Sequence, residues 1–453
     1  MRSIWAVAKN TIKQAVRVKI AVVFIVLLLV ILPVMGSVMT GDGTLKGRLQ
    51  TFISYGFSLM SLLLCLFTIV ISVYTVSSDL KDRQAFTVLT KPIRRYQYLL
   101  GKLMGVAVLD VALLVFFASA IYGIARVMPA FVDADERQQQ AAQNEFYTAR
   151  VGLTPGMPDV SDEVMQTFEE LKKNGEVPQE VFQSQRNTEE YLQALEQQKR
   201  MERRAAGPGD RLVWQFENVW PADPGSSIFV RYKYDVSYNP ADLQIIGNWF
   251  VGDSRAYPYR GYGLERKDLI RTFHELEVPA EAVADDGFLS VGFLNMPVNG
   301  PVVIFPFEDG LEVLYKKTSW EDNFVRAALL ILWRLLFLIC MGILAATFLS
   351  FPVALLLCLL VFFAGTVNEF IVESIDILSE TVGMIYAFTV EPLLKLLPQF
   401  DKYNGGDYLV TGRFIGWSAV AQAGGLMVAV KGGLLFALSV LIFSFKEIDK
   451  IVV

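Results

Sequence analysis

Four carboxylates towards the end of the chain are spaced so that one face of a helix would hold them all. They follow i, i+4, i+7 and i+11, and at about 100° per residue this gathers them into one narrow stripe. The four are Glu369, Glu373, Asp376 and Glu380. Two interpretations stay open: the solvated face of a helix at a membrane interface, or an acidic rim at the outer mouth of an export path.

Other residue types that commonly carry chemistry are scarce. His274 is the one histidine, so neither a Ser-His-Asp or Cys-His set nor a Cys/His zinc site is expected. Cys65, Cys340 and Cys358 lie in apolar runs, where cysteine packs as a small hydrophobic residue. The sequence has no Gly-x-x-x-x-Gly-Lys-(Ser/Thr) stretch to bind nucleotide phosphates and no nucleic-acid motif. We therefore expect a chain that is not an enzyme, holds no metal or cofactor of its own and binds no nucleic acid.

Three charged residues, Asp110, Arg334 and Lys431, lie inside long apolar runs. At ~1.5 Å per residue, Asp110 lies about 16 Å from the inner start of its run and Arg334 about 15 Å from the outer start of its own. Both positions are near the midplane of a hydrocarbon core about 30 Å thick, where an unpaired charge costs at least ~2.5–3.5 kcal/mol. We predict that Asp110 and Arg334 pair, directly or through a water. The alternative places Asp110 against Lys431 or a polar cavity, with Arg334 reaching outward.

Charges at such depth must be held by several membrane helices, and the composition of the chain is consistent with such a bundle. Hydrophobic residues make up 53% of the 453-residue chain and charged residues only 19%, as is typical of a polytopic membrane protein. We predict a polytopic α-helical membrane protein with six transmembrane helices, and an extracytoplasmic α+β domain made of a helical hairpin and an antiparallel β-sandwich. The membrane parts are residues 20–128 with spans 1–3 and residues 323–453 with spans 4–6, including a re-entrant or interfacial segment at 369–412.

The charge distribution predicts how these parts are oriented. Residues 129–322 contain 33 acidic and 19 basic residues, a net charge of −14, whereas the remainder carries +9. Because basic loops stay on the cytoplasmic side, we place both termini in the cytoplasm, residues 129–322 outside it, and the chain in the cytoplasmic (inner) membrane. Residues 1–19 are expected to form a cytoplasmic interfacial helix with its cations towards anionic membrane lipids.

Within residues 129–322, two patterns follow each other. Residues 133–206 have sparse apolar positions that fit short helices, and residues 210–316 alternate as the strands of a sandwich do. Aromatic residues of this part could stack on a glycan, or form the core and rim of the sandwich instead. They are Trp214, Trp220, Trp249, Tyr257, Tyr259 and Tyr262.

The loop at residues 79–98, between the second and third predicted spans, is strongly basic. Residues 78–102 hold six basic residues and only two acids. Phe86, Leu89 and Ile93 recur at helical spacing, and Pro92 interrupts the helix before the chain re-enters the membrane. One interpretation is an ordinary positively charged anchor loop.

The other interpretation rests on a resemblance. Residues 81–95, KDRQAFTVLTKPIRR, followed by Leu-Leu-Gly-Lys at 99–102, resemble the first cytoplasmic loop of type-2 ABC exporter permeases. The resemblance implies that this loop forms a coupling helix that docks on a separate ATPase subunit, where ATP and Mg²⁺ bind, and that a second permease copy completes the transport path. It assigns ATPase coupling to Asp79, Lys81, Asp82, Arg83, Phe86, Leu89, Lys91, Pro92, Arg94, Arg95 and Lys102.

The resemblance thus predicts the membrane subunit of an ABC exporter with an unidentified substrate. Two alternatives remain. One is an ABC-driven mechanical or scaffolding subunit that acts on an envelope protein through residues 129–322 without transport. The other is an envelope sensor that binds a glycan through the same residues, although the chain has no cytoplasmic output domain to support that role.

Overall fold

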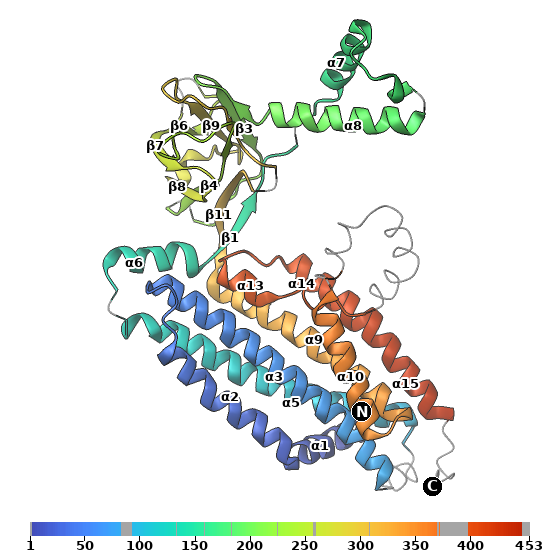
Figure 1. Ribbon diagram of the computed structural model, residues 1–453. Helices are drawn as coiled ribbons and strands as arrows, with labels where there is room; N and C mark the ends of the chain where they lie inside the picture. The colour runs from blue at the N-terminus through green and yellow to red at the C-terminus, as the bar shows by residue number, and fades with distance from the viewer. Residues whose placement is uncertain are drawn as a thin grey trace. The chain divides into compact units, whose positions relative to one another are not determined.

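The structure is a computed structural model, and its chain divides into two compact units (Figure 1). The membrane unit comprises Met1–Ala149 and Ser319–Val453, and the sheet unit comprises Arg150–Thr318. The residues that the structure describes are 2–82, 93–132, 134–157, 159–182, 184–223, 225–256, 260–307, 309–368, 371 and 397–445. An α-helical membrane part beside a part with antiparallel sheets agrees with the predicted fold class in outline.

Long apolar helices dominate the membrane unit. Within the described residues, four stretches are long and apolar enough to cross a membrane: Leu45–Lys81, Arg95–Ala130, Trp320–Phe348 and Trp417–Phe445. A fifth results if the bent pair at the N-terminal end counts as one span, and Phe351–Thr366 is a shorter apolar helix. The helices are α1 (Arg2–Arg17), α2 (Lys19–Val38), α3 (Leu45–Lys81), α5 (Arg95–Val127), η1 (Met128–Ala130), α6 (Glu136–Ala141), η2 (Ala142–Phe146), α9 (Trp320–Phe348), α10 (Phe351–Thr366), α13 (Gly405–Val410), α14 (Trp417–Ala423), η5 (Gly424–Gly432) and α15 (Gly433–Phe445).

Helix α1 packs on α5 through two glycines spaced four residues apart. A methyl group added at Gly101 would lie 2.6 Å from Cβ of Val7, and one added at Gly105 would lie 2.7 Å from Cβ of Thr11. Such small residues let two helix backbones approach closely. The face of α1 that carries Val7 and Thr11 is therefore buried, while Trp5 on its other side is exposed. Helix α1 is thus amphipathic, and its buried face meets a helix of the same chain; its place at the membrane interface stays a prediction.

The sheet unit contains three sheets of mainly antiparallel strands. Their strand orders are β1-β11-β4-β8, β2-β10-β5 and β3-β9-β6-β7. In the first, Tyr232 of β4 pairs with His274 of β8 and with Leu311 of β11. The strands are β1 (Thr148–Leu153), β2 (Ala205–Ala206), β3 (Arg211–Phe216), β4 (Ser227–Tyr232), β5 (Asp235–Val236), β6 (Gln244–Asp253), β7 (Arg260–Leu269), β8 (His274–Pro279), β9 (Leu289–Asn295), β10 (Val303–Ile304) and β11 (Leu311–Ser319).

One hydrophobic core joins the two four-stranded sheets. The ring centroids of Tyr232 on β4 and Trp249 on β6 are 4.1 Å apart, and Trp249 also packs on Phe293 of β9. Along β6, alternate residues enter this core, as in sandwiches. Helices α7 (Ser161–Asn174) and α8 (Gln185–Glu202), with η3 (Gln179–Phe182), have a small core of their own. The stretch 133–206 is nevertheless not wholly helical, because β1 and β2 join the sheets from within it.

Candidate functional site

The ends of α3 and α5 that flank segment 83–92 are joined by a buried ion pair. Nζ of Lys102 lies 2.7 Å from Oδ2 of Asp79, and both side chains are almost fully buried. Asp79 is in the last turn of α3 and Lys102 follows the first two turns of α5. The resemblance assigned ATPase coupling to both residues. Their side chains are buried and face the interior of the chain, so neither lies on a docking surface, and the coupling assignment itself stays a prediction.

Every hydrogen of the Lys102 ammonium has an acceptor. Besides Asp79, Nζ donates to the carbonyl oxygen of Thr75 at 2.7 Å and to Oε1 of Gln14 at 3.1 Å. An ammonium has three hydrogens and no acceptor, so these three contacts satisfy it completely. Gln14 belongs to α1, and the ammonium therefore ties α1 and α3 to α5.

The carboxylate of Asp79 is satisfied in the same way. Oδ2 accepts from the hydroxyl of Tyr98 at 2.8 Å as well as from Lys102, and Oδ1 accepts from Nε2 of Gln14 at 3.1 Å. The same amide nitrogen donates to Oγ of Ser78 at 2.6 Å. We call Gln14, Asp79, Tyr98 and Lys102 the Asp79–Lys102 network. A buried polar network with every member satisfied fixes one arrangement of its helices, whereas an incomplete one would destabilise them.

The position of Asp79 is unfavourable for an isolated helix. A carboxylate in the last turn of α3 lies at the negative end of the helix dipole. Lys102, Tyr98 and Gln14 compensate for this placement with hydrogen bonds from two other helices. The arrangement offers no nucleophile or general base to a substrate. What it can do is make the ends of α1, α3 and α5 move as one body.

Helix α15 is attached to the same end of α5. Nη1 of Arg95 donates to the carbonyl oxygens of Phe443 and Ser444 at 2.7 and 2.5 Å. These carbonyls lie in the last turn of α15, where no intrahelical donor is left for them. The rings of Tyr98 and Phe443 are stacked, with centroids 5.7 Å apart. Arg95 is thus engaged within the chain, and the prediction that it serves the ATPase directly stays untested.

The other predicted coupling residues divide into two groups. Lys81, Asp82 and Arg94 are exposed and flank segment 83–92 on both sides. The remainder lie outside the described residues: Arg83, Phe86, Leu89, Lys91 and Pro92. Surface basic groups therefore surround the segment, while the pair beneath them is internal.

Asp110 and Arg334 do not form the direct pair that was predicted. Oδ2 of Asp110 accepts from the hydroxyl of Thr68 at 2.9 Å, and Oδ1 has no hydrogen-bond partner among the described residues. Arg334 instead donates to Oγ of Ser61 at 3.2 Å and to the carbonyl oxygen of Phe400 at 2.6 Å. Two different hydroxyl groups of α3 thus hydrogen-bond to the two charges, that of Thr68 to Asp110 and that of Ser61 to Arg334.

The cations at depth bind backbone carbonyls of the segment that precedes α13. Lys431 donates to the carbonyl oxygen of Leu397 at 2.6 Å, and Arg334 to that of Phe400. Residues 397–404 are not helical, so their carbonyls need donors from elsewhere. The sequence identifies the two cations but not their acceptors. Every residue has a backbone carbonyl, and which carbonyls lack a backbone donor is known only from the fold.

Two further predicted sets are only partly visible. Glu369, Glu373, Asp376 and Glu380 lie outside the described residues, as do Tyr257 and Tyr259. Trp249 is buried in the sheet core and offers no free face to a glycan, whereas Trp214 packs edge-on against Phe305 and is half-buried. Trp220 and Tyr262 are exposed. Within the described part of the chain, no group of three or more His, Cys, Asp or Glu residues is arranged to hold a metal ion.

Gln14 and Tyr98 are the members of the network that sequence reasoning missed. Tyr98 lies four residues before Lys102, so the two share a face of α5, and this spacing was a usable signal. Gln14 carried no signal, because a glutamine on an amphipathic helix is ordinarily solvated. Comparison with family models, with curated proteins and with solved structures found no match for the chain.

Proposed function

We propose that the chain is the membrane subunit of an ABC exporter and works with a separate cytoplasmic ATPase. The observation that carries the proposal is the Asp79–Lys102 network. Segment 83–92 connects α3 with α5 in the chain, and the network links those two helix ends to each other and to α1. A force applied to the segment therefore acts on three helices at once, which is what a coupling element requires.

The exposed charges around the segment supply the docking surface in this proposal. Lys81 and Arg94 stand on either side of it and are free of the network. ATP and Mg²⁺ bind to the partner, and closure of its nucleotide sites displaces the segment. The chain itself carries out no hydrolysis and holds no cofactor.

The proposed topology follows the charge distribution. Six spans, counting α10 and a first span formed around α2, place both termini on the cytoplasmic side of the cytoplasmic membrane and residues 129–322 outside it. A second copy, identical or related, completes the transport path. The acidic stripe at 369–380 then belongs to the outer mouth.

Co-purification tests the proposal. The tagged full-length chain, extracted from its native membrane, should bring with it a subunit that hydrolyses ATP. Combined Lys81→Glu and Arg94→Glu should abolish that association, because both reverse exposed charges next to the segment. Lys173→Glu, an equivalent reversal on exposed α7, is the matched control and should leave it intact.

The network gives a second, separable variant. Asp79→Asn should retain the ATPase on the chain but lower the stimulation of its activity by the membrane subunit, since the link beneath the docking surface is weakened. Unchanged association in the Lys81/Arg94 variant would contradict docking at this loop. Inverted topology in that variant would instead identify a simple anchor loop.

A mechanical role is the second candidate function. The observation that favours it is that Arg150–Thr318 forms a unit with its own core, as expected of a domain that acts on an envelope protein. Reconstituted vesicles separate the two: ATP-dependent accumulation of a substrate supports export, and ATP hydrolysis without accumulation supports mechanical work. A glycan sensor would need neither ATP nor the ATPase.

A further inference from the structure

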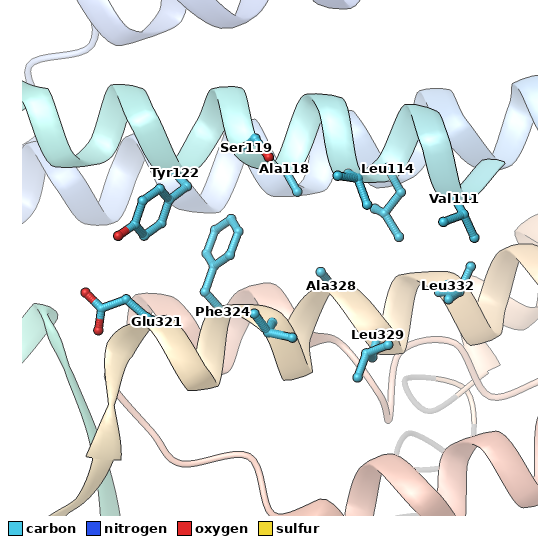
Figure 2. Close-up of a pocket in the computed structure, with 12 residues that line it drawn as sticks. Val111, Leu114, Ala118, Ser119, Tyr122, Glu321, Phe324, Ala328, Leu329 and Leu332 are labelled. Atoms are coloured by element: carbon cyan, nitrogen blue, oxygen red, sulfur yellow. The ribbon is translucent and has the colours of Figure 1, made fainter. Parts of the chain in front are cut away.

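An apolar groove runs between α5 and α9 on the membrane unit (Figure 2). Its volume is about 470 Å³. Small side chains create the hollow: Ala118 and Ser119 on α5 lie across from Ala328 on α9, with larger residues at both ends (Figure 2). Val115 and Val325, which also line it, are 59% and 56% exposed. The groove therefore opens onto the apolar surface of the bundle.

The length of the groove matches one leaflet of a bilayer. On α5 it extends from Val111 to Tyr122 and on α9 from Glu321 to Leu332. Each stretch covers eleven residue steps, or about 16 Å of helix at ~1.5 Å per residue. Half of a hydrocarbon core is about 15 Å thick. An acyl chain that enters at the Tyr122 end would thus reach the bilayer centre at the Leu332 end.

The two ends of the groove differ in polarity. Tyr122 and Glu321 lie together at one end, and Val111 and Leu332 lie at the other (Figure 2). One turn beyond Tyr122, Arg126 forms an ion pair with Glu321, and the two side chains are 37% and 38% exposed. The guanidinium also lies 4.9 Å from the ring centroid of Tyr147. A cation and an anion, both accessible, thus stand at the point where a lipid headgroup would begin.

We propose that this groove binds one phospholipid with a zwitterionic headgroup that carries an amine. The acyl chain fills the groove, the phosphate accepts hydrogen bonds from Arg126, and the ammonium donates to Glu321. If the groove were empty, its walls would lack dispersion contacts. Water is an unfavourable occupant because hydrating apolar walls costs free energy, so an acyl chain fills the groove best. A guanidinium suits phosphate because it donates through several N–H groups. The site does not depend on the ATPase.

Photolabelling tests the site in the full-length chain. The probe is a phosphatidylethanolamine with a diazirine at the end of one acyl chain, added to nanodiscs of phosphatidylglycerol, and labelled peptides are mapped by mass spectrometry. We expect label on α5 and α9 at the apolar end of the groove. A phosphatidylglycerol probe with the same chain should label these peptides less, because its headgroup has no amine for Glu321.

Variants of the groove and of its polar end test whether the labelling comes from a lipid bound at this site. Ser119→Phe, at an exposed position, fills the hollow and should reduce labelling about tenfold, the loss expected when about two methylenes are expelled. Val30→Phe, on the exposed face of α2, is the matched control and should change nothing. Glu321→Gln should remove the preference for the amine-bearing probe.

Three results would overturn the proposal. Label spread evenly over exposed apolar residues, including those around Val30, would mean ordinary bilayer contact. Labelling unchanged by Ser119→Phe would place the chain elsewhere. A disulfide-linked dimer formed by Val115→Cys would show that a second copy covers the groove; the three native cysteines are buried, so the introduced thiol is the accessible one.

Discussion

Removing one partner of the buried Asp79–Lys102 pair should destabilise the protein more than removing both. Asp79→Asn leaves the Lys102 ammonium buried with neutral acceptors alone, among them Gln14 and the Thr75 carbonyl. Lys102→Met leaves the carboxylate with Tyr98 and Gln14. Breaking a buried pair by deleting one member costs about 3–5 kcal/mol, because an uncompensated charge stays in the interior. We expect each single variant to lose stability near the lower end of this range, since the remaining charge keeps some hydrogen bonds in both variants.

The double variant should recover much of this loss. Asp79→Asn with Lys102→Met leaves no charge, and the asparagine can still accept from Tyr98. Oε1 of Gln14 loses its Lys102 donor, at about 1–3 kcal/mol for an unsatisfied buried group, while the Thr75 carbonyl keeps the backbone hydrogen bond of α3. The free energy of unfolding of the double variant should therefore fall by about 1–3 kcal/mol, less than the sum of the two single losses by several kcal/mol.

The measurement is a double-mutant cycle on the full-length chain in detergent micelles, followed by far-ultraviolet circular dichroism. Lys81→Met, an exposed lysine in the same last turn of α3, is the control and should stay within about 0.5 kcal/mol. Additive losses in the cycle would refute the reasoning. A loss in either single variant as small as that of Lys81→Met would also refute it, because the pair would then be hydrated and not buried.

Three further predictions concern other contacts. Asp110→Asn and Arg334→Gln should have additive effects on unfolding, within about 0.5 kcal/mol, because the two groups have different partners. Arg95→Gln should increase hydrogen exchange at the end of α15, since it removes charged donors from two carbonyls, at roughly 1.5–3 kcal/mol each. Residues 150–318, expressed alone, should fold, and their stability should depend on Asp286 in acid. Hydrogen bonds from Arg255 lower the pKa of Asp286 to about 2, below an unfolded value of about 3.9. The stabilisation is therefore complete above pH ~4 and is lost as the pH falls towards 2. Urea midpoints across that range should show a smaller acid loss in Arg255→Gln.

The sequence predicted the elements better than it predicted their contacts. Apolar runs located α3, α5 and α9 because a membrane helix needs a long uncharged stretch, which composition alone reveals. Strand β7 departs from the alternation expected for residues 210–316, since Arg260–Leu269 is largely exposed and charged and shows no alternation of apolar residues. Pairing with β6 makes it a strand, and such pairing is a property of the fold.

The partners of buried charges were the hardest to foresee. Depth alone suggested that Asp110 and Arg334 meet, but depth does not say which face of a helix a charge occupies. Asp79 and Lys102 were assigned to ATPase coupling by the resemblance, which gave no sign that they pair inside the chain. Their burial depends on how α1 crosses α5 at Gly101 and Gly105; the spacing of these glycines indicates a close helix contact, but it does not say which helix makes it.

Helix α5 connects the candidate site with the lipid groove, and this has a thermodynamic consequence. Its first turns hold the Asp79–Lys102 network and the end of α15, and its later turns form one wall of the groove. If the ATPase displaces α5 relative to α9, the groove changes width, and the affinity for lipid differs between the two states. Linkage then requires that lipid in the groove shift the equilibrium between those states by the same free energy. Ser119→Phe should therefore alter ATP hydrolysis by the assembled complex although it touches neither segment 83–92 nor the network. An unchanged rate in that variant, with its labelling abolished, would show that α5 does not move against α9 during the cycle.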